Sequence, residues 1–164
     1  MIVVADTSPL NYLIQIDCDH LLPRLFGRIL VPNGVMDELA HTAAPPKVKA
    51  WLIQPPAWID VNVVQLVPDP RLAILGRGER EAIQLAETQN AHLLLIDERK
   101  GRQEAMRRGL KTTGTLGVLI SAGELGLIKP ASAYRRLLDE TTFRATPALE
   151  SRFLEQVRTS GERP

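Results

Sequence analysis

The stretch MIVVADTSPLNYL (residues 1–13) joins a run of apolar residues to a cluster of oxygen-bearing side chains. Residues 2–5 are mostly β-branched and predict a buried strand, whereas residues 7–9 (TSP) are typical of a helix start. Asp6 therefore stands at the carboxyl end of a predicted strand. An acid at this position is either a cap in the first turn of the helix or a member of a functional site, and this stretch alone leaves both interpretations open.

Strand-like and helix-like segments alternate along the rest of the chain. Further strands are predicted at 28–32, 58–67, 91–97 and 111–114. Helices are predicted at 9–16, 19–26, 33–41, 44–54, 78–89, 98–109, 115–126 and 143–157. Near-continuous apolar strands that alternate with helices predict an α/β fold, a three-layer α/β/α sandwich with a central parallel β-sheet.

Length and composition predict one domain inside the cell. A chain of 164 residues with 45% hydrophobic residues can close one sizeable core, so we expect a single domain over 1–164, with a C-terminal helical extension at about 141–164. The lone Cys18 cannot form an internal disulfide. No leader and no long apolar run is visible, so we expect a cytoplasmic protein without a membrane partner.

The charges balance overall but are segregated along the chain. Lys and Arg total 20 against 19 for Asp and Glu. Residues 1–40 hold five acids against two bases, whereas residues 99–111 hold six bases against Glu104 alone. A basic run of this kind either contacts a polyanion or forms a solvated helix face, and we favour the solvated face for the run taken by itself.

Four acids are candidates for one site. Parallel sheets bind ligands beyond the carboxyl ends of their strands, and Asp6 and Asp97 each close an apolar run, IVVAD and LLLID. If the two strands are neighbours, both carboxylates face one crevice, which Glu38 and Glu79 could join from adjacent helices. Each acid taken singly has an ordinary role, such as complementing a helix dipole. Four converging carboxylates repel one another unless a cation neutralises them, and their oxygens suit Mg²⁺ or Mn²⁺.

Five stretches taken in order resemble a known family. These are VVADTSPL, VPNGVMDEL, GEREAIQLA, LLLIDERKGR and TTGTLGVL. Together they are similar to the PIN-domain nucleases, and more closely to a prokaryotic branch of uncharacterised proteins with that fold, over nearly the whole chain. The resemblance implies that Asp6, Glu38, Glu79 and Asp97 bind one or two divalent ions, Mg²⁺ or Mn²⁺, and catalyse the hydrolysis of RNA phosphodiester bonds.

The resemblance also implies substrate contacts and partners. Thr7 or Ser8 would support the first acid by a hydrogen bond and would lie at the substrate. The basic segment begins directly after Asp97, so we expect Arg99, Lys100 and Arg102 to hold phosphates, while Arg107 and Arg108 fit a solvated face equally well. Small PIN nucleases often act as toxins held by an antitoxin, so the expected partners are RNA, an antitoxin protein and a second copy of the chain.

Three acids near the site depart from the family pattern or could substitute within it. Glu79 stands where many members have Asp, so its longer side chain could reach a metal ion through water. Glu81 is a weaker substitute because residues two positions apart on a helix face nearly opposite directions. Glu98 follows Asp97 directly and could share its role.

A rival function comes from another class of protein. The chain could be a PIN-fold module that binds RNA or a protein partner and has lost catalysis. The three histidines are scattered and no Cys/His spacing suggests zinc, so catalysis would depend on the carboxylates and a divalent ion. Trp51, Trp58 and Tyr12 could stack on bases, although core packing suits each of them better. Metal-dependent RNA cleavage distinguishes the two functions.

Overall fold

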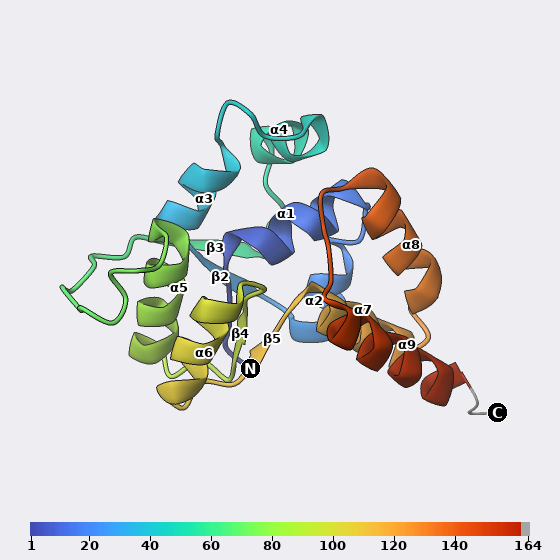
Figure 1. Ribbon diagram of the computed structural model, residues 1–164. Helices are drawn as coiled ribbons and strands as arrows, with labels where there is room; N and C mark the ends of the chain where they lie inside the picture. The colour runs from blue at the N-terminus through green and yellow to red at the C-terminus, as the bar shows by residue number, and fades with distance from the viewer. Residues whose placement is uncertain (162–164) are drawn as a thin grey trace.

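A parallel sheet in the order β3-β2-β1-β4-β5 forms the centre of the structure, a computed structural model that describes residues 1–161 (Figure 1). The strands are β1 (Val3–Ala5), β2 (Ile29–Pro32), β3 (Ile59–Asn62), β4 (Leu93–Leu95) and β5 (Thr112–Thr113). The chain runs outward from β1 to β3 and then crosses back to β4, which pairs with β1 on its other side. The predicted parallel sheet is confirmed, and the switch in strand order lies between β1 and β4.

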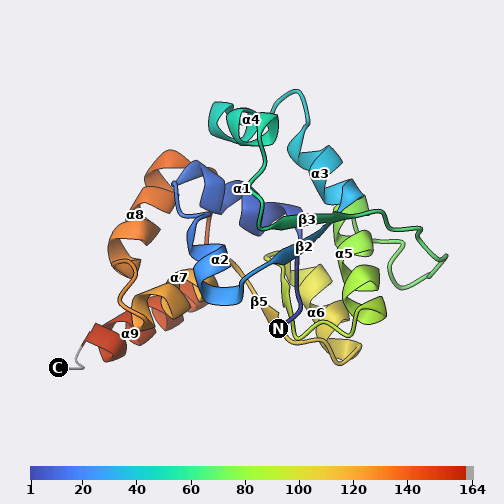
Figure 2. The same cartoon turned by 180° about the vertical axis from the view of Figure 1, so that it is seen from behind.

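Side chains of the strands alternate between two apolar cores, one on each face of the sheet. Val3 and Ala5 pack into the core that includes buried residues of α1 (Thr7–Gln15) and α7 (Thr115–Glu124), whereas Val4 packs into the core under α5 (Arg77–Thr88). Leu95 joins the first core and Leu94 the second. Figure 2 shows helices on both sides of the sheet, which confirms the predicted α/β fold with two helical layers.

The remaining helices complete the two layers. They are α2 (Leu21–Phe26), α3 (Asn33–Leu39), α4 (Pro46–Ile53), α6 (Arg99–Arg107), α8 (Pro130–Glu140) and α9 (Pro147–Gly161). No helix is predicted from the sequence at α8, which buries only Ala133, Tyr134 and Leu137 and carries a proline in its first turn. None of the helices within residues 1–161 combines the length and apolar character that a membrane crossing demands.

The third predicted strand is shorter than expected. Only Ile59–Asn62 pair with β2, and residues 63–67 continue as a loop. Side chains hold this loop in place of a neighbouring strand: Asn33 accepts a hydrogen bond from the amide of Val64, and Gln84 bonds both the amide and the carbonyl of Val67. The β-branched composition of the loop mimics a strand without a partner to pair with.

The C-terminal helix α9 packs on α7 and α8 (Figure 1). Phe153 is 2% exposed and stacks on Tyr134 with ring centroids 4.9 Å apart, while the Tyr134 hydroxyl donates a hydrogen bond to Glu150. Of the helical extension expected at about 141–164, residues 147–161 form the helix, residues 141–146 are not helical, and 162–164 lie outside the described residues. The contacts of Tyr134 therefore fix α9 to α8.

Candidate active site

Asp6 lies at the switch point between β1 and β4. Its amide donates to the carbonyl of Leu95 at 2.9 Å, which carries the pairing of the two strands one residue beyond β1. Its side chain is 3% exposed, makes no capping hydrogen bond to α1, and leaves Oδ1 buried without a hydrogen-bond partner. Burial raises the pKa of Asp6 to about 8; the Thr7 amide opposes the rise, and the charges of Glu79, Glu38 and Asp97 add to it. The geometry therefore does not support a capping role.

Glu38 reaches the same edge of the sheet from α3. The Thr7 hydroxyl donates to its Oε2 at 2.5 Å and the amide of Gly78 donates to its Oε1 at 2.8 Å. A Cβ atom on Gly78 would lie 2.5 Å from Glu38 Oε2, so the backbone can approach this carboxylate only at a glycine. Thr7 or Ser8 was expected to support Asp6 by a hydrogen bond; the backbone amide of Thr7 does so, whereas the Thr7 hydroxyl orients Glu38.

Glu79 lies in the first turn of α5, where the helix dipole favours an acid. Its Oε2 is buried without a hydrogen-bond partner and lies close to Gly101, on which a Cβ atom would sit 2.9 Å from that oxygen. Burial raises the pKa of Glu79, and the charges of Glu98 and Glu38 raise it further. The start of α6 thus buries Glu79 Oε2, a second carboxylate oxygen without a hydrogen-bond donor.

Asp97 follows β4 and holds the start of α7. Its Oδ1 accepts from the Thr115 amide and its Oδ2 from the Thr115 hydroxyl, both at 2.7 Å. Burial raises the pKa of Asp97, while the two hydrogen bonds from Thr115 and the charge of Arg102 oppose the rise. The carboxylate therefore links the end of β4 to the start of α7, the helix that follows β5.

The four predicted acids surround one edge of the sheet without forming a closed ligand set. The carboxylates of Glu38, Glu79 and Asp97 are near enough to raise the pKa of Asp6. Within residues 1–161, however, no three Asp, Glu, His or Cys side chains lie close enough together to hold a metal ion. Glu38 is turned toward Gly78 and Asp97 toward Thr115, so hydrogen-bond donors hold these two carboxylates apart.

The chemistry of the donors nevertheless fits a hard divalent cation. Asp6 Oδ1 and Glu79 Oε2 are buried carboxylate oxygens without donors, which costs free energy unless a proton or a cation compensates for the lost hydration. An ionised carboxylate has about four lone-pair sites, so Glu38 and Asp97 keep acceptor capacity beyond their present hydrogen bonds. Oxygen-only donors of this kind suit Mg²⁺ or Mn²⁺.

The two substitute acids have different surroundings. Glu81 is 1% exposed, pairs with Arg77 Nε at 2.9 Å and packs against Gly34, on which a Cβ atom would lie 1.6 Å from Glu81 Oε2. Its ion pair lies within α5, and its contact with Gly34 packs α5 against α3. Glu98 is exposed, accepts a hydrogen bond from the Gly101 amide as the cap of α6, and lies beside Asp97.

The basic segment divides into two groups. Arg99 and Lys100 are exposed on the first turn of α6, and Arg102 lines a cavity together with Asp97. Arg107 pairs with Glu104, and Arg108, with a side chain only 12% exposed, contacts three carboxylates. The partners of Arg108 are Asp69 at 2.6 Å, Glu104 at 2.7 Å and Glu87 at 3.1 Å. The solvated face, one of the two interpretations left open for Arg108, is therefore wrong, because three carboxylates bind this guanidinium inside the protein.

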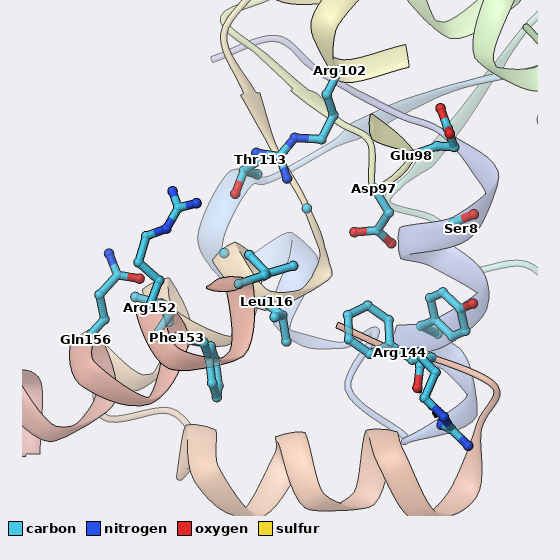
Figure 3. A pocket seen from close by; sticks show the side chains of 16 residues that line it. Ser8, Asp97, Glu98, Arg102, Thr113, Leu116, Arg144, Arg152, Phe153 and Gln156 are labelled. Carbon is cyan, nitrogen blue, oxygen red and sulfur yellow. Dashed lines mark hydrogen bonds between the residues drawn. The ribbon is translucent and has the colours of Figure 1, made fainter. Parts of the chain in front are cut away.

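A cavity of about 390 Å³ opens beside Asp97 (Figure 3). Its walls come from the start of α1, the start of α6, the first turns of α7 and one face of α9. The polar lining residues include Ser8, Asp97, Glu98, Arg102, Arg152 and Gln156. Arg152 and Gln156 are not predicted from the sequence, because nothing in a polar helix face more than 50 residues from Asp97 indicates that it packs against the site.

The chain was compared with known protein families, curated proteins and solved structures. A family model described as a PIN domain matches residues 2–159. No curated protein and no solved structure matches the chain.

Proposed function

Because the chain belongs to the PIN domain family, whose members are typically nucleases, we propose that it is a divalent-metal-dependent endoribonuclease that hydrolyses RNA phosphodiester bonds. The observation that carries this proposal is the pair of buried carboxylate oxygens without donors, Asp6 Oδ1 and Glu79 Oε2, beside the switch in strand order. Such oxygens cost folding free energy, and a bound cation would offset that cost.

The proposed cation ligands are Asp6, Glu38, Glu79 and Asp97. PIN domains typically bind divalent metals, and a bound Mg²⁺ or Mn²⁺ would acidify a water molecule and offset charge on the phosphate. The chain's own groups orient the acids: Thr7 and the Gly78 amide hold Glu38, and Thr115 holds Asp97. This orientation is prepared before any ligand arrives, which is the role we assign to these donors.

Substrate contacts are proposed on both sides of Asp97. Arg99, Lys100 and Arg102 on α6 supply positive charge to the RNA backbone, and Ser8 lines the cavity from α1. Thr7 lies at the same end of α1, where its hydroxyl is already bonded to Glu38. These contacts are to phosphate and sugar, so they position RNA without reading its sequence.

The experiment is metal-dependent cleavage by the purified full chain. An end-labelled RNA is incubated with Mn²⁺, Mg²⁺ or EDTA, and the products are separated on a denaturing gel. We expect cleavage with either ion, none with EDTA, and none from Asp6→Asn. Asp139→Asn is the matched control, because Asp139 is exposed on α8 and forms no ion pair with residues 1–161.

One observation favours the alternative function, a PIN-fold RNA-binding or partner module without catalysis. Within the described part of the chain no three acids converge, because Glu38 and Asp97 are engaged by hydrogen-bond donors. RNA binding by the wild type, with no cleavage in any metal, would select this alternative.

A toxin role in the cytoplasm, with an antitoxin partner, is part of the same proposal, as is a homodimer. A short neighbouring reading frame with a DNA-binding segment would supply the antitoxin candidate. Co-expression of the two genes should then yield a stable complex that suppresses RNA cleavage, and gel filtration of the chain alone should report whether two copies associate.

A further inference from the structure

Two arginines line opposite walls of the cavity beside Asp97. Arg102 projects from α6 and Arg152 from α9, and Figure 3 shows both guanidinium groups directed toward the opening near Thr113. Neither forms an ion pair or a side-chain hydrogen bond with residues 1–161, in contrast to Arg107 and Arg108 a turn further along α6. Two unpaired cations on facing walls create a position for an anion.

A third arginine that lines the cavity is already engaged. The guanidinium of Arg144 donates to the backbone carbonyls of Leu138, Thr141 and Phe143, and in Figure 3 it points away from the cavity. It satisfies the carbonyls at the end of α8. The positive charge available to a ligand is therefore that of Arg102 and Arg152.

The interior of the cavity is apolar and partly aromatic. Leu116 and Ile120 line it from α7 and Leu149 from α9, while Tyr12 and Phe143 form an edge-to-face pair with ring centroids 5.2 Å apart. A volume of about 390 Å³ suits one small planar group with its attached phosphate, not a wide groove. Aromatic and aliphatic walls of this kind accept a nucleobase by stacking and packing.

We propose that this cavity is a subsite for one unstacked nucleotide of a single-stranded RNA, with Arg102 and Arg152 on the same phosphate and the base against the apolar wall. This inference rests on the proposed function and adds the state of the substrate and the role of α9. Bases in a duplex are stacked and paired, so they cannot enter such a cavity, whereas bases of single strands can be splayed out. The subsite places the backbone of that nucleotide next to Asp97.

Binding is measured by fluorescence anisotropy with a labelled single-stranded RNA of 12 nucleotides, in EDTA so that no cleavage occurs. Arg152→Ala and Arg102→Ala should each weaken affinity by about tenfold, as expected for lost charge-assisted hydrogen bonds. Each should also reduce the slope of log affinity against log salt by about 0.7. Arg158→Ala is the control, because Arg158 is exposed on the same helix and does not line the cavity.

Three further arms separate the parts of the proposal. Because both guanidinium groups contact one phosphate, the Arg102→Ala/Arg152→Ala double variant should lose less than the product of the single losses. An RNA with abasic sites should bind the wild type more weakly than the intact RNA. A duplex of the same sequence should bind more weakly than the single strand and should lose little affinity in Arg152→Ala. Arg152→Gln, which keeps the aliphatic stem, repeats the test if Arg152→Ala lowers the melting temperature.

Several outcomes would overturn the subsite. They are equal losses in Arg152→Ala and Arg158→Ala, no loss in either cavity variant, multiplicative losses in the double variant, or abasic and duplex RNA bound as tightly as the intact single strand. Metal-dependent cleavage with Arg152-independent binding would reject the subsite and keep the nuclease. Arg152-dependent binding without cleavage in any metal would keep the subsite and reject the nuclease.

Discussion

Thr115 gives Asp97 two hydrogen bonds: its amide and its hydroxyl each donate to a different oxygen of that carboxylate, both at 2.7 Å. Because Thr115 is fully buried, no water molecule can replace its hydroxyl if it is removed. The start of α7 is therefore bonded to the residue that follows β4, across the segment that contains α6 and β5.

Thr115→Val should lower the free energy of unfolding by about 1–3 kcal/mol, because it leaves a buried carboxylate oxygen without its donor. Urea unfolding at neutral pH measures the change. Thr112→Val is the control, since Thr112 is a partly exposed threonine of β5 whose hydroxyl bonds to no residue within 1–161. Equal changes in the two variants would contradict a structural role for the bond to Asp97.

Gly78→Ala should displace Glu38. The added Cβ would lie 2.5 Å from Glu38 Oε2 and 2.9 Å from the Thr7 hydroxyl, so we expect a loss of about 1–3 kcal/mol in unfolding free energy together with weaker metal-induced stabilisation. Gly76→Ala is the matched control, because the nearest atom to its Cβ is 3.7 Å away. Thermal unfolding of both variants with and without Mn²⁺ measures these effects. Equal melting temperatures and equal metal-induced shifts in the two variants would show that the close approach of Gly78 does not orient Glu38.

Asp6 should make the metal-free protein less stable as pH rises. Burial raises its pKa from 3.8 to about 8, so the folded state binds the extra proton between these values and stability falls across that window. Asp6→Asn removes this titration and should match the wild type near pH 4 but exceed it in stability near pH 8. Urea unfolding in EDTA across this range measures both curves, and parallel curves would count against the prediction.

With a divalent metal bound, the wild type should be more stable than Asp6→Asn. A ligand that binds only the folded state stabilises it by about 2.7 kcal/mol at 100-fold excess over its dissociation constant, so Mn²⁺ or Mg²⁺ should raise the melting temperature of the wild type. Asp6→Asn and Asp97→Asn should lose most of that rise. Asp6→Ala adds a control for capping, which would destabilise the protein equally with and without metal.

Arg99, Lys100 and Arg102 should act on all RNA sequences alike. The triple alanine variant should bind every single-stranded RNA more weakly and with a flatter salt dependence, since phosphate contacts carry no sequence information. Arg135→Ala is the control, because Arg135 is exposed on α8 and does not line the cavity. Unchanged RNA affinity of the triple variant would show that these residues form a solvated helix face and do not contact RNA.

The sequence was sufficient for the sheet and for the place of Asp6 in it. The runs IVVAD and LLLID are apolar on both faces, as buried parallel strands must be, and β1 and β4 do pair. The 11-residue α8 is not predicted from the sequence because it buries only Ala133, Tyr134 and Leu137. Residues 63–67 resemble a strand because β-branched composition does not reveal whether a pairing partner is present.

The site was less predictable because its geometry depends on contacts between distant segments. The Thr7 hydroxyl finds Glu38, 31 residues away, only after α1 and α3 pack together. Arg108 forms its ion pairs with Asp69 and Glu87 only in the folded protein, because these two acids lie on other segments of the chain. A local pattern of acids or bases states which side chains are available, whereas tertiary packing decides which of them pair.

Gln84 acts as a one-residue substitute for a strand. Its side-chain amide accepts from the nitrogen of Val67 and donates to the carbonyl oxygen of the same residue, so it reproduces the pair of bonds that a neighbouring chain would offer. Loop residues beyond the edge strand β3, including Val63 and Val67, are otherwise exposed and apolar, a combination that favours self-association through edge-to-edge pairing. Because the side chain of Gln84 on α5 already bonds both backbone groups of Val67, these groups are not available for edge-to-edge pairing with another chain.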